Sequence, residues 1–392
     1  MTAIDTAIAA GVAAAHPRLI HLSRDLYDHP ETAWEEVRSA QRVAGQLSDR
    51  GFDVTDHYCG LDTAFAAQIG SGDLHIALCA EYDALPGLGH ACGHNLISAI
   101  TVGAALALAP VVDGLDLTLT VIGTPAEEGG GGKIEMLERG GFAGQHAAAM
   151  VHPGPVDVAR ARPFAVSHSH IEYRGKAAHA AAYPERGINA ADAFTVAQVA
   201  IGLLRQQLPA SVRVHGMMTR GGEAPNAIAE RTEGRWYVRA ETLTELADVE
   251  ARVMRCFEAG ALASGADLTV TPESKPYAEF RTDEGLLACY ERRAVAAGRH
   301  FNSGPDAMMA RASTDMGNVS QVLPAIHPYI GIDSLPAVNH QAEFAEATLT
   351  TAAETAIAHG ALALAGTIVD AASRSDIRHR LLTGPHPEQA PA

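Results

Sequence analysis

The chain has 392 residues, of which 47% are hydrophobic and 19% charged, so it can bury a sizeable core and is not a disordered protein. Its 29 Lys and Arg against 46 Asp and Glu give a formal net charge of -17. A polyanion is repelled by that average field, which argues against nucleic acid as a partner.

Five scattered cysteines do not form the pattern of a disulfide framework, so we expect reduced thiols and a cytoplasmic protein. The N-terminal segment 1–26 is Ala-rich but carries Asp5 and no basic leader, which predicts a surface-packed helix rather than a signal peptide. No uncharged stretch of about 18 apolar residues occurs, and we expect no membrane span.

Strand and helix patterns alternate over the next part of the chain. LHIALCA (74–80) and DLTLTVIGT (116–124) are predicted strands, and HAAAMVH (146–152) is a third apolar run. HNLISAITVGAALALAP (94–110) is apolar nearly all round and predicts a buried helix, whereas GKIEMLERGG (132–141) predicts a short helix that ends in glycine. This alternation predicts an α/β fold with a mainly parallel sheet flanked by helices.

The pattern changes near residue 164. Strand and helix segments then follow in the order β-α-β-β-α-β, at 164–175, 189–208, 211–222, 231–242, 243–265 and 267–274. This order is typical of an α+β open-faced sandwich, with two helices on one face of an antiparallel sheet. The α/β character returns after residue 275 and ends in an Ala-rich helix at 342–373.

We therefore predict a discontinuous core domain made of residues 1–163 and 276–392, with a smaller domain inserted at 164–275. The tail from residue 383 onward is expected to fray.

Polar clusters follow the three core strands. They are AEYDALPGLGHACGHNLISA (80–99), GTPAEEGGGG (123–132) and VHPGP (151–155). Ligands bind outside the carboxyl ends of the strands in open parallel sheets, so we expect the three clusters to meet in one site.

The side chains in these clusters are of the types that bind metal ions. They are Cys92, His94, Glu127, Glu128 and His152, and NHQAEF (339–344) adds His340 at the start of the last predicted helix. A thiolate, imidazoles and a carboxylate suit Zn²⁺, Mn²⁺ or a related ion. Five ligands exceed a closed tetrahedral site and fit two ions with a bridging ligand. One of the adjacent glutamates can bind metal while the other faces a water.

Each residue alone has an ordinary explanation, since a lone Cys or His is usually a core residue and a Glu pair often starts a helix. Their joint position at strand ends favours the metal site. The GGGGK segment is not a phosphate loop, because Lys133 is followed by Ile134 rather than Ser or Thr. The G-x-S-x-G elbow of serine hydrolases does not occur in the sequence.

The sequence resembles the aminoacylase/dipeptidase metallopeptidase family. The resemblance is carried by AEYDALPGLGHACGHN, GTPAEEGGGGK, GKAAHAAAYPERGINAADA (175–193) and GGEAPNAIAE (221–230), and it covers nearly the whole chain. Within the family the chain is most similar to the amidohydrolase branch with Cys-x-His ligands. That branch includes p-aminobenzoyl-glutamate hydrolase and aminoacylase-1-like dipeptidases that act on Xaa-Lys or Xaa-Arg.

The resemblance implies two divalent metal ions, zinc or manganese, bound by five residues, with Cys92 as the bridge. The five are Cys92, His94, Glu128, His152 and His340. It implies that Glu127 is the general base and that Asp83 orients a ligand. Glu81 stands where many relatives outside this branch carry a metal-binding His, and by this resemblance Glu81 is not a ligand because His94 takes that role.

The inserted domain resembles the family's lid and dimerisation domain. His179 matches a lid histidine that reaches the active site of the partner subunit and supports the oxyanion, and Asn226 matches a lid asparagine near the substrate. Arg239 matches a lid arginine that could hold a substrate carboxylate, in a loose alignment. The resemblance implies a homodimer formed through this domain.

The expected function is a metal-dependent amidohydrolase or peptidase that acts on a small-molecule amide. Candidate substrates are an N-acyl amino acid, a dipeptide of the Xaa-Lys or Xaa-Arg type, and an aminobenzoyl-glutamate-like compound. A metal-activated water attacks the amide carbonyl, with Glu127 as base. The alternative is a non-catalytic ligand-binding relative, which predicts a broken ligand set or a replaced Glu127, whereas both are intact here.

Overall fold

The computed structural model describes residues 2–384, so the tail expected to fray lies outside the described residues from 385 onward. The chain divides into two compact units. The core unit comprises Met1–Arg162 and Phe280–Ala392, and the inserted unit comprises Pro163–Glu279. The boundaries expected from the sequence, after residues 163 and 275, lie one residue later and four residues earlier than those of the structure.

A six-stranded sheet with the order β1-β2-β4-β3-β5-β11 forms the centre of the core unit. Its strands are β1 (Asp53–Asp56), β2 (Phe65–Ile69), β3 (Leu74–Ala80), β4 (Leu117–Gly123), β5 (Ala147–Ala149) and β11 (Ala325–Ile326). Strands β4, β3, β5 and β11 pair in parallel, which confirms the mainly parallel sheet. Strands β2 and β1 add an antiparallel edge that the sequence analysis missed.

The apolar run 146–152 is not one strand, which corrects the prediction. Only Ala147–Ala149 joins the large sheet as β5. After a short connection the chain forms β6 (His152–Gly154), which pairs in parallel with β12 (Tyr329–Gly331) in a separate two-stranded sheet. His152 therefore begins the small sheet and does not lie at the end of a strand of the large one.

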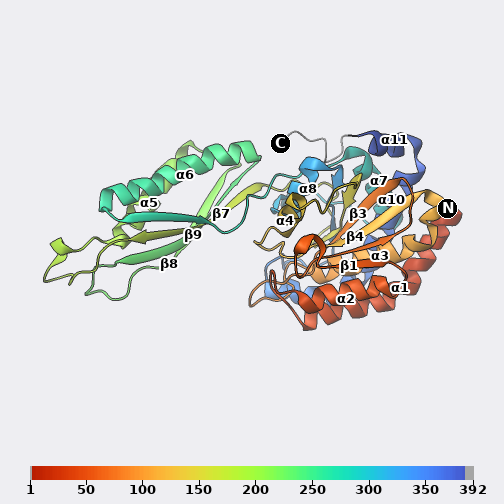
Figure 1. The fold of residues 1–392 in the computed structure, drawn as a ribbon, viewed down its shortest axis with the longest axis horizontal. Coiled ribbons are helices and arrows are strands. Elements are labelled where there is room, and N and C mark those ends of the chain that lie inside the picture. Colours follow the sequence, from red (N-terminus) through yellow and green to blue (C-terminus); the bar gives the residue numbers. More distant parts are fainter. Residues whose placement is uncertain (1, 385–392) are drawn as a thin grey trace. The chain divides into compact units, whose positions relative to one another are not determined.

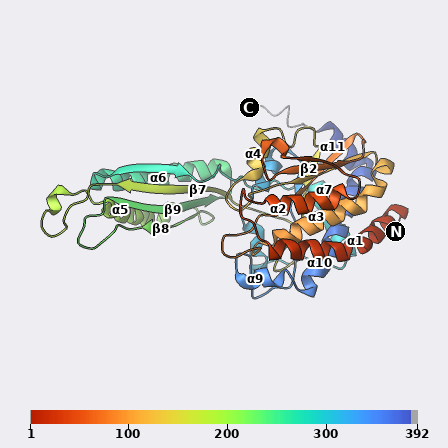
Figure 2. The same ribbon diagram turned by 60° about the horizontal axis from the view of Figure 1, so that its bottom comes forward.

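Helices cover both faces of the large sheet (Figure 1). They are α1 (Ala3–Asp28), α2 (Val37–Ser48), α3 (His94–Leu108), α4 (Gly132–Glu138), α7 (Glu284–Ala296), α8 (Met316–Val322), α9 (Ala342–Ala347), α10 (Thr351–Ser373) and α11 (Ser375–Thr383). Helices α1, α3 and α10 lie side by side on one face (Figure 2). Helices α4 and α8 pack against the other face. Strand β3 alternates accordingly, with Ile76 and Leu78 in the first cluster and Ala77 and Cys79 in the second.

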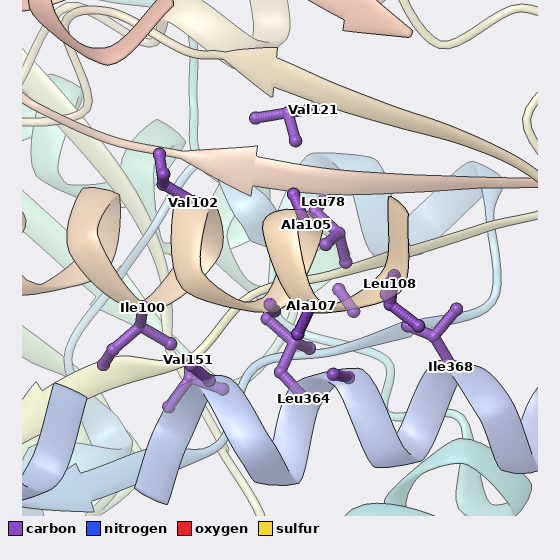
Figure 3. Packing of buried hydrophobic residues seen from close by; sticks show 14 of the residues in the cluster. Leu78, Ile100, Val102, Ala105, Ala107, Leu108, Val121, Val151, Leu364 and Ile368 are labelled. Carbon is purple, nitrogen blue, oxygen red and sulfur yellow. The ribbon is translucent and has the colours of Figure 1, made fainter. Parts of the chain in front are cut away.

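Helix α3 is buried on nearly every side, as its apolar composition predicts, with Leu106 only partly buried. Figure 3 shows Val102 directed toward the strands and Leu108 directed toward Ile368 of α10. By length and composition, His94–Val111 and Thr351–Ser373 are each apolar enough to cross a membrane. In the structure 78% and 67% of these segments are buried, so packing in the core accounts for their composition.

The helix expected over 342–373 is two helices, α9 and α10, which is a second correction. Thr350 caps α10, since its side chain accepts a hydrogen bond from the backbone N–H of Ala353, and this cap starts a new helix. His340 consequently does not start the last helix. It precedes α9 in a loop, with a left-handed φ of 70°.

The inserted unit is an antiparallel sheet with the strand order β10-β7-β9-β8 and two helices on one face (Figure 1). Its elements are β7 (Ala165–Arg174), α5 (Ala190–Leu204), β8 (Arg213–Arg220), β9 (Arg231–Ala240), α6 (Leu243–Ser264) and β10 (Asp267–Pro272). Trp236 and Val238 of β9 face the helices, and the alternate residues Arg235 and Tyr237 face the other way. The predicted open-faced sandwich is confirmed.

Candidate metal centre

Three groups of ligand-type side chains meet in the core unit, and within each group the ligand atoms lie within 4.8 Å of one another. The groups are Cys92 with His94 and His152, Cys92 with Glu128 and His340, and Glu81 with His94 and Glu127. The structure thus brings together all five predicted ligands and the predicted base. Cys92 and His94 each belong to two of the three groups.

The segment Cys92–Gly93–His94 can turn sharply only because its middle residue is glycine. Gly93 has φ 91°, a conformation that L side chains rarely adopt, and it immediately precedes α3. A Cβ at this position would lie 2.4 Å from Cγ of Pro153 in β6. The turn therefore brings Cys92 and the first residue of α3 against the small sheet that carries His152.

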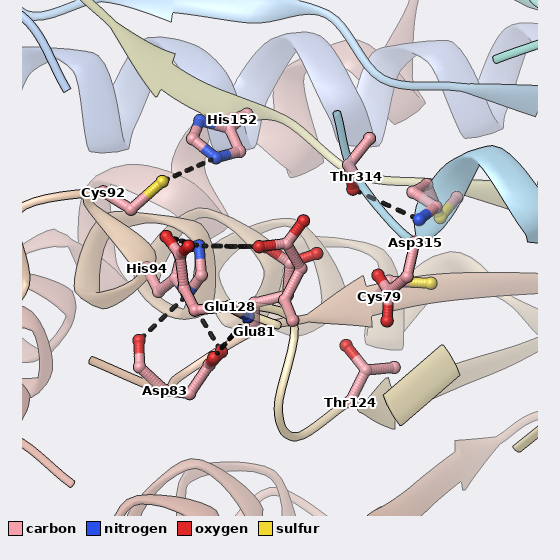
Figure 4. A network of polar contacts seen from close by, with 12 residues as sticks. Cys79, Glu81, Asp83, Cys92, His94, Thr124, Glu128, His152, Thr314 and Asp315 are labelled. Atoms are coloured by element: carbon pink, nitrogen blue, oxygen red, sulfur yellow. Dashed lines mark hydrogen bonds and ion pairs between the residues drawn. The ribbon is translucent and has the colours of Figure 1, made fainter. Parts of the chain in front are cut away.

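Asp83 fixes the orientation of two neighbouring residues (Figure 4). Its carboxylate Oδ1 lies 3.0 Å from Nδ1 of His94, and its backbone oxygen lies 2.9 Å from the same nitrogen. Its Oδ2 accepts a hydrogen bond of 2.9 Å from the backbone N–H of Glu128. With Nδ1 engaged in this way, His94 turns Nε2 toward the carboxylates of the centre. Asp83 thus contacts His94, one of the ligands that the resemblance implies.

His152 also has one ring nitrogen held by a partner, which in this case is a backbone carbonyl oxygen, and the other turned toward the centre. Its Nδ1 lies 2.7 Å from the carbonyl oxygen of Pro153, and its Nε2 lies 3.6 Å from Sγ of Cys92. Burial and the neighbouring His327 lower the pKa of His152 to about 3. The imidazole is therefore neutral at pH 7, which is the form that binds metal ions.

The two adjacent glutamates follow a strained turn. Ala126 has φ 54°, and its N–H donates a 2.8 Å hydrogen bond to Oε1 of the buried Glu36, whose Oε2 accepts one from Thr63. Glu127 is buried, and burial together with Glu81 and Glu128 raises its pKa well above the usual range. Glu36 was missed from the sequence, because nothing in its spacing connects it to a turn 90 residues away.

His340 lies at the accessible side of the centre. Its Nε2 is 3.2 Å from Oε1 of Glu128, and 52% of its side chain is exposed, which leaves it open to a ligand from solvent. The preceding Asn339, also missed from the sequence, donates from Nδ2 to the backbone oxygen of Cys92 at 3.0 Å. This bond ties the loop of His340 to the thiol segment.

The polar atoms of this site fit a bound cation. Within residues 2–384, Nε2 of His94 and Oε2 of Glu81 are buried without a hydrogen-bond partner, and they lie 3.4 Å apart. A buried polar atom left unpaired costs about 1–3 kcal/mol. A divalent cation satisfies both atoms at once. The thiol, imidazole and carboxylate donors are those that Zn²⁺ and Mn²⁺ accept.

A buried ion cluster beside the centre was also missed. Nζ of Lys133 lies 2.5 Å from Oε1 of Glu81 and 2.7 Å from Oδ1 of Asp315, and all three side chains are buried. Burial favours the neutral form of Glu81, but Lys133 overrides it and lowers the pKa of Glu81 to about 2. Lys133 and Asp315 are 182 residues apart, so no spacing pattern in the sequence could reveal the pair.

The inserted unit carries the three predicted lid residues at its two ends. The segments of His179 and Asn226 adjoin, because the N–H of Ala180 donates to the backbone oxygen of Asn226. Both side chains are exposed. Arg239 is near the opposite end of β9 and donates from Nε to His215 at 3.4 Å. Arg231, at the start of β9, lies next to the segments of His179 and Asn226. Arg239 follows eight residues later in the same strand, and at ~3.3 Å per residue the two arginines are roughly 26 Å apart.

The core unit is therefore an α/β domain with a candidate metal centre whose carboxylates follow the parallel strands β3 and β4. The sequence profile of "Peptidase family M20/M25/M40" matches residues 77–360. The chain belongs to this family of metal-dependent hydrolases, which confirms the resemblance inferred from its motifs.

Two relatives with assigned activities are similar to this chain. One is the Xaa-Arg dipeptidase of Mus musculus, 39% identical over 91% of this chain and 86% of the relative. The other is a component chain of the p-aminobenzoyl-glutamate hydrolase of Escherichia coli, 34% identical over 64% of this chain and 56% of the relative. A crystal structure of a dinuclear metal binding peptidase from Bacillus subtilis shares the fold, with a TM-score of 0.65 and 24% identity, over 89% of this chain and 98% of that one.

Proposed function

We propose that this protein is an amidohydrolase with two divalent ions, zinc or manganese, that cleaves a dipeptide whose C-terminal residue is Arg or Lys. The observation that carries the proposal is the buried carboxylate of Glu127 beside a gathered set of thiol, imidazole and carboxylate donors. Cys92, His94, Glu128, His152 and His340 would hold the ions. The similarity to the Xaa-Arg dipeptidase, over 91% of the chain, supports the choice of substrate.

Divalent ions supply Lewis-acid chemistry and acidify water in sites of this kind. Glu127 accepts the proton of the attacking water as the new C–O bond forms at the amide carbonyl. Burial, Glu81 and Glu128 raise the pKa of Glu127 in the metal-free protein, and bound cations would lower that pKa again, so that the carboxylate is ionised when it accepts the proton. Glu127 then delivers the proton to the amine nitrogen as the C–N bond breaks.

The inserted unit would complete the site. His179 would support the oxyanion, Asn226 would contact the substrate, and Arg239 would hold its carboxylate. His179 lies beside the segment of Asn226 at one end of the inserted unit, and Arg239 lies near the far end of β9. This separation supports a homodimer, because one copy of the unit carries the two residues at opposite ends. Two features offer surface on which a second copy of the inserted unit could pair. One is the exposed edge strand β8, and the other is the pair of exposed side chains Leu203 in α5 and Leu262 in α6.

The substrate assignment is tested with a panel of small amides. Purified protein loaded with Mn²⁺ or Zn²⁺ is incubated with Xaa-Arg and Xaa-Lys dipeptides, N-acyl amino acids and p-aminobenzoyl-glutamate, and the released amine is quantified. We expect the highest kcat/KM for the basic dipeptides. A preference for p-aminobenzoyl-glutamate, the substrate named for the second relative, would replace the proposed substrate and keep the proposed chemistry.

Chelation separates the proposal from a binding protein on the same scaffold. Removal of metal should abolish turnover, and added Mn²⁺ or Zn²⁺ should restore it. A protein that binds these amides with metal present but turns over none of them would contradict the enzymatic proposal.

The remaining expectations for this chain are a cytoplasmic location, with none of the five cysteines paired, and the absence of nucleic-acid and membrane partners.

A further inference from the structure

Glu81 is the carboxylate of the centre that the proposed ligand set does not use. It follows β3 directly, its side chain is completely buried, and its Oε1 is 2.5 Å from Nζ of Lys133. Lys133 is held in turn by both carboxylate oxygens of Asp315, one at Nζ and one at the backbone N–H. This clamp fixes Oε1 of Glu81 on Lys133 and so sets the orientation of the carboxylate.

The second oxygen of this carboxylate points at the centre. Oε2 of Glu81 lies 3.4 Å from Nε2 of His94, and among the described residues neither atom has a hydrogen-bond partner. Glu81, His94 and Glu127 also form one of the three groups whose ligand atoms lie within 4.8 Å of one another. The two atoms form an ion pair when His94 is protonated. Once Nε2 of His94 binds an ion, a Glu81 that is not itself a ligand would leave its buried Oε2 without a partner.

We propose that Glu81 is a sixth protein ligand of the metal centre, with Oε2 bound to the same ion as Nε2 of His94. Oε1 stays on Lys133, so Glu81 binds through one oxygen. This inference rests on the proposed metal centre and revises the ligand set implied by the sequence, from which Glu81 is excluded.

The extra oxygen changes which ion the site prefers. Without Glu81, the ion at His94 has mainly the thiolate of Cys92 and imidazole nitrogens, a set that favours Zn²⁺. A carboxylate oxygen shifts the preference toward harder ions such as Mn²⁺ and raises the coordination number that the site can supply. Glu81 therefore keeps one of the two ion positions usable by manganese.

The direct test uses the wild-type protein loaded with Mn²⁺ and, separately, with Zn²⁺, and locates the ions by anomalous diffraction. We expect an ion within about 2.0–2.3 Å of Oε2 of Glu81 and of Nε2 of His94. Ions bound at Cys92 and His152 but farther than about 3 Å from Oε2 would overturn the role of Glu81 and leave the proposed function intact. A protein that binds no ions would overturn the proposed function itself.

A second test needs no crystals. The affinities of metal-free wild type and Glu81→Gln for Mn²⁺ and Zn²⁺ are measured by calorimetry, with circular dichroism to verify folding. We expect Glu81→Gln to weaken Mn²⁺ binding at one of the two positions at least ten times more than Zn²⁺ binding. Equal weakening of both ions would assign Glu81 a positioning role only and contradict the proposal.

The matched control is Glu36→Gln. Glu36 is as deeply buried in the same unit, but its oxygens accept hydrogen bonds from Thr63 and Ala126 and do not face His94. The loss of this carboxylate should leave the ratio of Mn²⁺ to Zn²⁺ affinity unchanged. If Glu36→Gln shifted the ratio of Mn²⁺ to Zn²⁺ affinity as much as Glu81→Gln does, the shift would be a general effect of removing a buried charge, and Glu81 would not be a ligand.

Discussion

The imidazoles of His94 and His152 each have one nitrogen engaged within the protein and the other turned toward the site. Asp83 engages Nδ1 of His94, and the carbonyl of Pro153 engages Nδ1 of His152. Such partners select the tautomer and the ring orientation before any ion arrives. The motif H-A-C-G-H indicates the ligands, but only the folded chain reveals which atom of each side chain is available.

Glu127→Gln tests the base. The amide cannot accept the proton of the attacking water, whereas the five proposed ligands are untouched, so we expect kcat to fall by roughly 10²–10⁴-fold with two ions still bound. Turnover is measured under saturating substrate, and metal content by plasma emission spectroscopy. Activity within a few-fold of wild type would remove Glu127 from the mechanism, and loss of metal would make it a ligand.

Metal binding should release protons. Burial acts to lower the pKa of His94, but Asp83 and Cys92 raise it well above its ordinary value, so the metal-free imidazole is charged at neutral pH. Burial and Glu128 raise the pKa of the Cys92 thiol well above its ordinary value. Both groups must lose a proton to bind an ion, so the apparent affinity should increase with pH.

The measurement is calorimetric titration of metal-free protein with Zn²⁺ in buffers of different ionisation enthalpy, at several pH values between 6 and 8. The number of protons released follows from the dependence of the heat on the buffer. An affinity independent of pH, with no proton release, would mean that the ligands are already deprotonated and that the pKa values of His94 and Cys92 are not raised.

At the scale of elements, the glycine between Cys92 and His94 joins the start of α3 to the small sheet. Gly93→Ala places a Cβ 2.4 Å from Pro153 in a left-handed conformation. We expect a loss of at least about 2 kcal/mol in the free energy of unfolding of the metal-free protein, together with weaker metal binding. Urea unfolding followed by circular dichroism measures the first quantity, and zinc titration the second.

Gly45→Ala in α2 is the control. Nothing lies within 4 Å of a Cβ at that position, so the substitution should stabilise the protein by roughly 0.5–1 kcal/mol through helix propensity alone. If both variants had the same stability, the close approach of Gly93 to Pro153 would not matter for the fold.

The elements that the sequence predicts well are those with strong periodicity. The buried strands β3 and β4, helix α3 and the whole β-α-β-β-α-β insertion follow from their apolar patterns. The failures have local physical causes. Thr350 caps a new helix inside an apolar Ala-rich run, and the run 146–152 changes sheets after Ala149. The spacing of apolar residues indicates neither the new helix at Thr350 nor the change of sheet after Ala149.

The centre was predicted as a set of residue types but not as a set of bonds. Cys92, His94, Glu128, His152 and His340 could be chosen because their chemistry is characteristic and they cluster in short motifs. Lys133 with Asp315, and Glu36 with Ala126, could not be chosen. Each pair joins distant parts of the chain, and neither carries a signature beyond a common charged residue.

At the scale of the whole molecule, a homodimer in which His179 serves the partner's site predicts complementation. His179→Ala and Cys92→Ala are each expected to be nearly inactive. Refolded together in equal amounts, they should regain about a quarter of the wild-type activity, since half of the dimers are mixed and each mixed dimer has one complete site. Turnover of the refolded mixture is the measurement, with the dimer verified by analytical ultracentrifugation.

The control mixes His179→Ala with a chain that carries both substitutions, and no pairing of these two chains produces a complete site. Two results would contradict the shared site: activity recovered in the control mixture, or no activity recovered in the mixture of His179→Ala with Cys92→Ala. Either result would place His179 in the site of its own chain or outside the site altogether.

The insertion at Pro163–Glu279 has a consequence for synthesis on the ribosome. A nascent chain that has reached residue 162 has made β5 but not β11, its parallel neighbour, and has made Lys133 but not Asp315. The inserted sandwich, with its own apolar cluster, emerges next and can fold first. The core can complete its sheet and pair Lys133 only after residues 280–340 leave the tunnel, so His340 is the last of the proposed metal ligands to join the centre.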